Sequence, residues 1–363
     1  MKQFSRIKPV YRNKNNIPFG VQLEELINCE PAFSKDPSLI EVAKKVLSSS
    51  LQQGTITNYE GVVRDFKTFA RNNNYEEHTT EHSVTHFLLH LEKKSVSNSY
   101  ISKVKPALCM YEQITNTEPT AFSKPVIRIL DGIKNLAATR KTPVKKAPRL
   151  SLEIIKKMVE KVITPFVTNP ERVNAKNLRT VFRITIIYFT VCRFNCFSTL
   201  KAENFKDQGD EIEIQFTRAK NDQKHRGNVT KLVQNNTKFC PVFITRFYFK
   251  RFGFRFGNQE KDERLVNCRL RKINCMWQPQ DGAGLSYTTA TEQLRYLVRQ
   301  VGESAERITD KSAKMEGVTN MLEAGTPMVD VANHGRWKTV EIIQTYKHNS
   351  DQYKRSVAKQ IPF

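Results

Sequence analysis

The fold is decided by four short runs: Lys311-Ser-Ala-Lys314, Leu322-Glu-Ala-Gly325, His334-Gly-Arg-Trp337-Lys-Thr and Gln344-Thr-Tyr346-Lys-His. Their apolar spacing predicts helices over 312–324, 328–332 and 340–346, and Gly325 stands where a C-cap glycine would end the first helix. Lys311 and Lys314 are three residues apart at the start of that helix, and Trp337 precedes Tyr346 by nine. Two cations therefore stand at the start of the first helix, an indole precedes the last helix, and a phenol ends it.

Two upstream stretches have matching chemistry. Tyr188-Phe-Thr-Val-Cys-Arg193-Phe-Asn-Cys-Phe-Ser-Thr-Leu200 continues an apolar helix predicted over 177–194, which ends in arginine. Further on, residues 211–217 alternate polar and apolar side chains, residues 220–227 have turn chemistry, and β-branched residues resume at Val229. This pattern predicts a β-hairpin with Lys220 at its tip.

In this order, the motifs resemble those of the tyrosine recombinases, the phage-integrase and Cre-like enzymes that cut DNA through a phosphotyrosine. That family has an apolar helix running into arginine, a lysine on a mobile hairpin, a basic-x-x-Arg helix start, and a His or Trp nine positions before the nucleophilic tyrosine. The Gly-Arg-Trp-Lys-Thr string looks particularly like eukaryotic mobile-element members. The resemblance covers residues 150–350 by motif and 38–135 by the expected helical core-binding domain.

The resemblance implies a catalytic role for six residues. Arg193 and Lys314 would clamp the charge that develops on the phosphate, and Lys220 would be the general acid for the leaving 5′ oxygen. Trp337 would donate its indole N–H to the phosphate. Surrounding cations, Lys311 among them, would help to ionise the Tyr346 phenol, a group whose pKa is ordinarily about 10. Neither a metal nor another cofactor enters this mechanism.

The sequence departs from the family at Lys314, where arginine is usual, and has lysine at 311, where histidine or lysine is usual. Lysine keeps the charge but loses the two parallel hydrogen bonds of a guanidinium. Three function classes remain, ranked in this order: an active recombinase encoded by a mobile element, a domesticated DNA-binding descendant with impaired catalysis, and a type IB topoisomerase. The last usually lacks so long a core-binding domain.

Composition indicates a nucleic-acid partner independently of the motifs. The 363 residues include 59 Lys plus Arg against 36 Asp plus Glu, a net charge of +23. Such an excess predicts a polyanionic partner, for which double-stranded DNA is the leading candidate. Hydrophobic residues at 39% exclude a disordered basic tail, and seven cysteines without a CxxC pair predict reduced thiols.

The chain is expected to divide into a loose arm (1–35), a helical domain (36–136), a basic linker (137–149) and a catalytic domain (150–363). The first domain should have helices over 39–47, 57–70, 82–91, 97–114 and 126–136, and the second should be mainly α with one small sheet. By the resemblance, the first is a SAM-like core-binding domain. The two would form a C-shaped clamp on DNA and assemble as a tetramer when two sites pair.

The predicted DNA-binding residues are basic residues of the linker and of the Trp337 motif: Arg140, Lys141, Lys145, Lys146, Arg149, Arg336 and Lys338. The apolar run 181–192 is interrupted by Arg183 and is too short to span a bilayer. We therefore expect a soluble protein without a membrane partner, nuclear in a eukaryote and otherwise nucleoid-associated or cytoplasmic.

Three further patterns have structural explanations. His78, His82, His86 and His90 are spaced by four, as metal ligands on a helix would be, but no cysteine or carboxylate cluster stands nearby in sequence to complete a site. Cys192 and Cys196 are expected to be buried thiols. A core-filling role is favoured over base stacking for five phenylalanines that alternate with basic residues: Phe247, Phe249, Phe252, Phe254 and Phe256.

Overall fold

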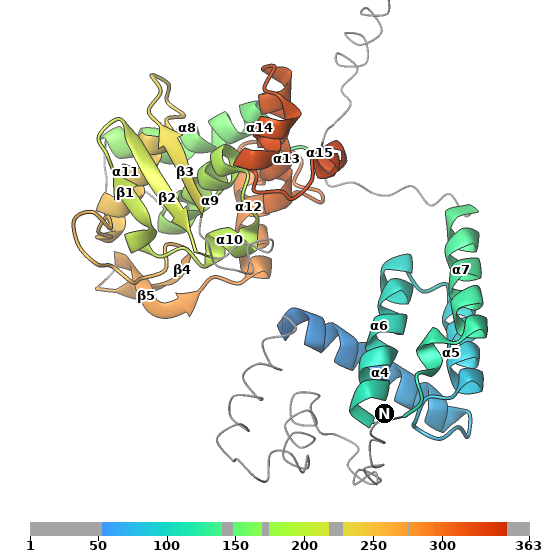
Figure 1. Cartoon of the computed structure of the whole chain (residues 1–363). Coiled ribbons are helices and arrows are strands. Elements are labelled where there is room, and N and C mark those ends of the chain that lie inside the picture. The colour runs from blue at the N-terminus through green and yellow to red at the C-terminus, as the bar shows by residue number, and fades with distance from the viewer. Residues whose placement is uncertain are drawn as a thin grey trace, which may run out of the picture. The chain divides into compact units, whose positions relative to one another are not determined.

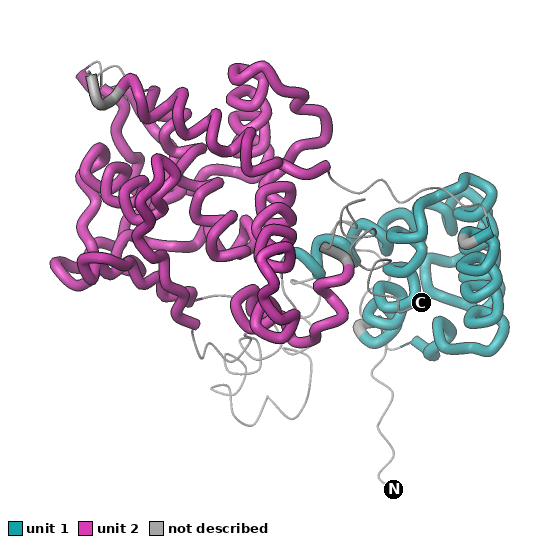
Figure 2. The backbone as a smooth tube through the Cα atoms, turned by 90° about the horizontal axis from the view of Figure 1, so that it is seen from above, with its two compact units in different colours: residues 1–144 teal, residues 145–363 magenta. Residues whose placement is uncertain are grey.

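The computed structural model describes residues 53–115, 117–139, 148–168, 174–217, 228–274 and 276–346. The chain divides into two compact units, residues 1–144 and 145–363, each with its own apolar core (Figure 2). The division falls inside the predicted linker. The first three linker residues are helical, however, because helix α7 continues to Thr139.

Within the described residues, unit 1 is built from four α-helices and a short 3-10 turn. Each α-helix overlaps a predicted helix, with bounds that differ from the prediction by up to four residues, while the helix predicted over 39–47 lies outside the described residues. Phe66, Phe87 and Leu88 meet at the centre of the unit and exclude water from it. The elements are α4 (Gln53–Asn72), α5 (Glu81–Lys93), α6 (Asn98–Thr115), η1 (Thr120–Phe122) and α7 (Lys124–Thr139).

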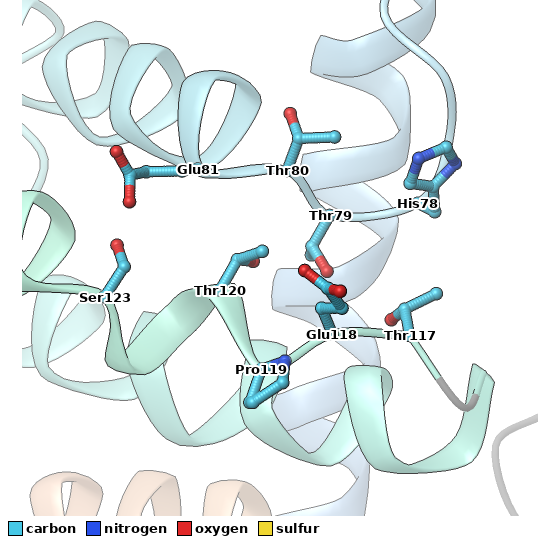
Figure 3. A pocket seen from close by; sticks show the side chains of 9 residues that line it. All are labelled: His78, Thr79, Thr80, Glu81, Thr117, Glu118, Pro119, Thr120 and Ser123. Atoms are coloured by element: carbon cyan, nitrogen blue, oxygen red, sulfur yellow. The ribbon is translucent and has the colours of Figure 1, made fainter.

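The histidines spaced by four pack against aromatic rings. The ring centroids of His86 and His90 lie 5.1 and 5.0 Å from that of Phe69, and the Tyr75 hydroxyl is 2.9 Å from Nδ1 of His86. His78 precedes α5 and lines a pocket together with threonine, serine, glutamate and proline side chains (Figure 3). In the part of the chain that the structure describes, no three His, Cys, Asp or Glu side chains gather as metal ligands.

Unit 2 is mainly helical, and its described residues include two antiparallel sheets. Its helical elements are α8 (Leu152–Thr168), α9 (Ala175–Thr190), α10 (Phe194–Ser198), η3 (Ala202–Asn204), α11 (Pro241–Phe252), α12 (Tyr287–Gln300), α13 (Asp310–Glu323), α14 (Met328–His334) and α15 (Glu341–Tyr346). No described helix has the length and apolar character needed to cross a bilayer.

The predicted hairpin forms the main sheet. Strands β1 (Phe205–Asp207), β2 (Glu211–Phe216) and β3 (Asn228–Val233) pair antiparallel in the order β1-β2-β3. Alternate residues of β2 and β3 are buried, which is the period-two pattern that the sequence shows. Figure 1 shows helix α9 running between this sheet and the group formed by α13, α14 and α15.

The expectation of a single sheet was wrong. Strands β4 (Cys268–Ile273) and β5 (Met276–Gly284) form a second hairpin. Most side chains on both strands are exposed or half-buried. Apolar and polar residues alternate from Cys268 to Arg271, but Met276–Gly284 shows no such alternation, so the sequence pattern does not give two matching strands.

Helix α9 is the centre of the core of unit 2. Its Phe182 ring stacks on Tyr248 of α11 with centroids 4.0 Å apart. The five phenylalanines around α11 are all buried in the same cluster, which confirms their core-filling role. The predicted end of α9 at residue 194 was wrong, because the helix ends at Thr190 and Val191 adopts a left-handed conformation with φ of 43°.

Candidate active site

Arg193 is placed by a strained turn. The preceding Val191 is fully buried, and a β-branched residue rarely adopts a positive φ. Such strain persists only where the surrounding packing fixes the backbone. Arg193 then occupies the N-cap position of α10 and is half-buried. The turn therefore redirects the chain after α9 and holds the arginine at the edge of the core.

Helix α13 carries the two lysines of the basic-x-x-Lys motif. Lys311 is exposed, whereas Lys314 is only 3% exposed. The helix lies unusually close to α9, since a Cβ on Gly317 would come within 2.3 Å of the Tyr188 carbonyl oxygen. Its first residue, Asp310, accepts a 2.7 Å hydrogen bond from Nε of Arg183 on α9. These contacts fix Lys314 relative to the end of α9.

The turn between α14 and α15 brings Trp337 to the same place. Its indole ring presses on Gly335, where a Cβ would lie 2.2 Å from a ring carbon, so this position accepts only glycine without movement of the ring. Helix α15 packs through the buried Ile343 and carries Tyr346, whose side chain lies outside the described residues. A small apolar cluster joins these elements to the turn before Arg193: Val191, Val318, Val331, Ala332, Trp337 and Ile343.

Lys314 is held in an environment that disfavours its charge. Its Nζ lies 4.4 Å from the centroid of the Trp337 ring, a cation–π distance. Burial, followed by the positive charge of Arg193, lowers the pKa of Lys314 to about 7, and Arg336 acts in the same direction. An anionic phosphate beside this lysine would favour the charged ammonium and raise the pKa again. The site is therefore suited to receiving a negatively charged ligand.

Arg336 lies within the same region and is bound to the protein. Its guanidinium donates hydrogen bonds to the Thr190 carbonyl at 2.9 Å and to the Thr230 hydroxyl at 2.7 Å. Its Cζ is 4.1 Å from the centroid of the Phe216 ring. Burial lowers the pKa of Arg336. These contacts give the guanidinium a role inside the fold, and its predicted DNA contact stays a prediction.

The structure thus brings together four of the predicted residues, Arg193, Lys314, Arg336 and Trp337, next to the helix that carries Tyr346. Lys338 is exposed. Arg149 donates to the buried Glu316 at 2.7 Å, so this linker residue also has an internal partner. Five predicted site residues lie outside the described residues: Arg140, Lys141, Lys145, Lys146 and Lys220.

Three residues that support the site were not predicted: Arg183, Asp310 and Glu316. Arg183 gives a signal in the sequence, because an arginine inside a long apolar helix must find a buried counter-charge. Glu316 gives none, since its partners Arg149 and the Leu152 backbone N–H are more than 160 positions away. Cys192 and Cys196 are buried as expected, and burial raises the pKa of the Cys192 thiol to about 11.

Comparison with known proteins identifies the fold. No family model and no curated protein matches the sequence. Among solved structures, the XerH site-specific recombinase bound to palindromic difH substrate has a TM-score of 0.56 at 15% identity, with 94% of each chain covered. The Tn1549 transposon integrase in complex with transposon right-end DNA has a TM-score of 0.51 at 12% identity, covering 86% of this chain and 94% of that one. The chain therefore has the fold of the tyrosine recombinases and integrases.

Proposed function

We propose that this protein is a site-specific DNA recombinase or integrase that cleaves and rejoins DNA through a 3′-phosphotyrosyl bond on Tyr346. One observation carries the proposal: in a tyrosine-recombinase fold, a buried lysine and a tryptophan meet beside Arg193, next to the helix that holds Tyr346. Each of these groups matches a motif position of the family. The Gly-Arg-Trp-Lys string further supports an origin in a mobile element of the eukaryotic type.

In the proposed reaction, the Tyr346 oxygen attacks the scissile phosphorus and the bond from phosphorus to the 5′ oxygen breaks. The phenol proton passes to solvent water, and Lys220 gives its own proton to the departing 5′ oxygen. Arg193 and protonated Lys314 stabilise the added charge on the nonbridging oxygens, and Trp337 donates its N–H to one of them. The side chains supply all of the positive charge that the reaction uses. Rejoining is the same sequence in reverse.

The proposed partner is double-stranded DNA. The net charge of +23 supports this, and the two structural relatives are themselves complexes with DNA. Because bound phosphates release counterions, duplex affinity should fall with salt at a log–log slope of about 0.9 per phosphate contacted. We further propose a tetramer on paired sites, and a nuclear or nucleoid location where that DNA is found.

A specific observation favours a second candidate function. Lysine stands at position 314, where the family has arginine, and burial keeps this lysine only weakly basic. A catalytically impaired descendant would keep the fold and its DNA affinity but form no covalent bond. The two candidates therefore differ in a single measurable product, the protein–DNA adduct.

A nicked suicide duplex tests the proposal, because loss of the short 5′ product traps the adduct for a denaturing gel. Wild-type protein should form the adduct. Tyr346→Phe should abolish it and leave duplex binding nearly unchanged, since only a hydroxyl is lost. Tyr296→Phe, at an exposed tyrosine of α12, is the matched control and should behave as wild type. Duplex binding without any wild-type adduct would instead establish the impaired descendant.

A further inference from the structure

The turn after α14 caps the end of α9. The last carbonyl groups of a helix have no partner within it and need donors from elsewhere. Two of these carbonyls in α9 receive them from neighbouring residues: Phe189 accepts from Nε2 of His334 at 2.7 Å, and Thr190 from Arg336 at 2.9 Å. The end of α9 is thereby tied to the segment that carries Trp337.

Arg336 continues from this cap to the sheet. Its other terminal nitrogen reaches the Thr230 hydroxyl on β3, and its guanidinium covers the ring of Phe216 at the end of β2. Phe216 is paired with Asn228, and Ile214 with Thr230. These are the ends of β2 and β3 that flank residues 217–227 in the sequence. One side chain therefore connects three segments: the end of α9, the strand ends and the Trp337 turn.

We propose that Arg336 is a positioning residue for strand transfer, which fixes the ends of β2 and β3 against the end of α9. The proposal rests on the proposed function of the protein. The backbone supports it, because Arg336 has a φ of 56°, a conformation that costs energy for a side chain other than glycine. That cost is sustained where the contacts of the side chain determine the local structure.

The expected consequence is selective. The end of α9 keeps the His334 hydrogen bond and the buried Val191 when Arg336 is lost, so Arg193 should stay in place. The strand ends lose a charged hydrogen bond and a guanidinium that covers an aromatic ring. In the sequence, Lys220 lies between these strand ends. Loss of Arg336 should therefore impair protonation of the leaving oxygen more than stabilisation of the phosphate.

A leaving-group substitution measures this selectivity. A duplex with sulfur in place of the bridging 5′ oxygen has a weakly basic leaving group that needs no general acid, a group that otherwise contributes about 10²–10⁴-fold. Arg336→Gly removes the side chain and still accepts the left-handed backbone. We expect it to slow adduct formation roughly 10²-fold on the oxygen duplex but less than about fivefold on the sulfur duplex. Arg336→Lys, with one ammonium, should fall between this variant and wild type.

Thr230→Val tests the same contact from β3, because valine has nearly the same volume as threonine but no hydroxyl group. It should show a smaller loss with the same sulfur rescue, and it should add nothing to Arg336→Gly if the two residues act through one hydrogen bond. Lys231→Gln is the matched control, since it removes one positive charge from an exposed side chain on the same strand and should leave both rates unchanged. Circular dichroism and duplex binding confirm that each variant is folded.

Equal losses on the two duplexes, or no loss on either, would overturn the positioning role while leaving the proposed function intact. A wild-type protein that forms no adduct on either duplex would overturn the proposed function, and this inference with it. The rescue ratio is the loss of rate on the oxygen duplex divided by the loss on the sulfur duplex. A ratio of about tenfold or more for Arg336→Gly and Thr230→Val, without such a ratio for Lys231→Gln, would establish the role.

Discussion

Two buried cations of unit 2 have opposite surroundings. Arg183 is 0% exposed and donates to Asp310, which is 1% exposed, at 2.7 Å. Lys314 is 3% exposed, and the side-chain charge that affects it most is another cation, Arg193. The two cations meet the same first turns of α13: Arg183 contacts it through Asp310, and Lys314 lies one turn further along the helix. One turn of helix therefore contains an anchor and a reactive group.

This difference indicates that the charge of Arg183 stabilises the fold, whereas the charge of Lys314 serves the proposed reaction. A buried arginine paired with a carboxylate is compensated within the protein, whereas burial and the charge of Arg193 both disfavour the Lys314 cation, which an anion beside it would favour. Removing each cation should therefore change stability in opposite directions. This contrast is the basis of the predictions that follow.

The largest effect is expected from Lys314→Met, which keeps most of the volume and removes the charge. Adduct formation should fall by at least about 10³-fold, as for the loss of a main donor to the transition state. The free energy of unfolding at pH 7 should rise by about 1–4 kcal/mol, because burial and the charge of Arg193 disfavour the cation that the variant removes. Urea unfolding and the suicide duplex measure the two effects. A clear loss of stability would break the contrast.

Arg183→Gln should lower the free energy of unfolding by about 3–5 kcal/mol, because Asp310 is left as a buried charge without its arginine. The matched control is the double variant Arg183→Met with Asp310→Leu, which removes both charges and should recover most of this loss. Chemical denaturation gives both values. If the single variant were as stable as wild type, the ion pair would not be the anchor of α13.

The titration of Lys314 should also make the free energy of unfolding depend on pH. The folded-state pKa of Lys314, about 7, lies below the usual 10.5, so the unfolded state binds more protons between these values. Stability is then lowest below pH 7 and rises as the pH increases. From pH 7 to pH 9 the advantage of Lys314→Met over wild type should shrink by roughly 2 kcal/mol. Parallel unfolding curves for the two proteins at both pH values would check this.

The sequence predicted the elements whose local pattern matches their environment. The helices of unit 1 and the β2–β3 hairpin bury one face, and their apolar periods show it. The second hairpin has a local signal in β4 alone, because β5 buries no face, and the break at Val191 depends on packing around a left-handed residue, so neither feature could be predicted from the local pattern. The motif residues near Trp337 were found by their resemblance to a family motif, but only the folded chain shows that Arg336 turns inward to Thr190 and Thr230.

A smaller effect is expected at Gly335, against which the Trp337 ring packs beside Lys314. Gly335→Ala should cost about 1–3 kcal/mol and reduce adduct formation, because the new methyl group must displace the indole ring. Gly132→Ala is the matched control in α7, where a Cβ meets no atom within 4 Å. It should stabilise the protein by up to about 1 kcal/mol, as alanine does within a helix. Thermal unfolding measures the stability of both variants. Equal changes in stability for the two would contradict the role of Gly335.

The smallest effect is expected from Lys314→Arg, and its size depends on pH. At pH 7 the variant should match or exceed wild-type adduct formation within about threefold, since a guanidinium offers two parallel hydrogen bonds to phosphate. Above pH 7 free wild-type protein loses the Lys314 proton, whereas arginine keeps its charge, so the ratio of the variant rate to the wild-type rate should increase towards pH 9.

The larger side chain can cost about 1–3 kcal/mol by overpacking, so rates are normalised to folded protein. Lys231→Arg, an exposed lysine on β3, is the control and should show no such trend. A constant ratio for Lys314→Arg across this range would mean that DNA binding restores the lysine proton completely, so that the weak basicity of the free site has no kinetic consequence.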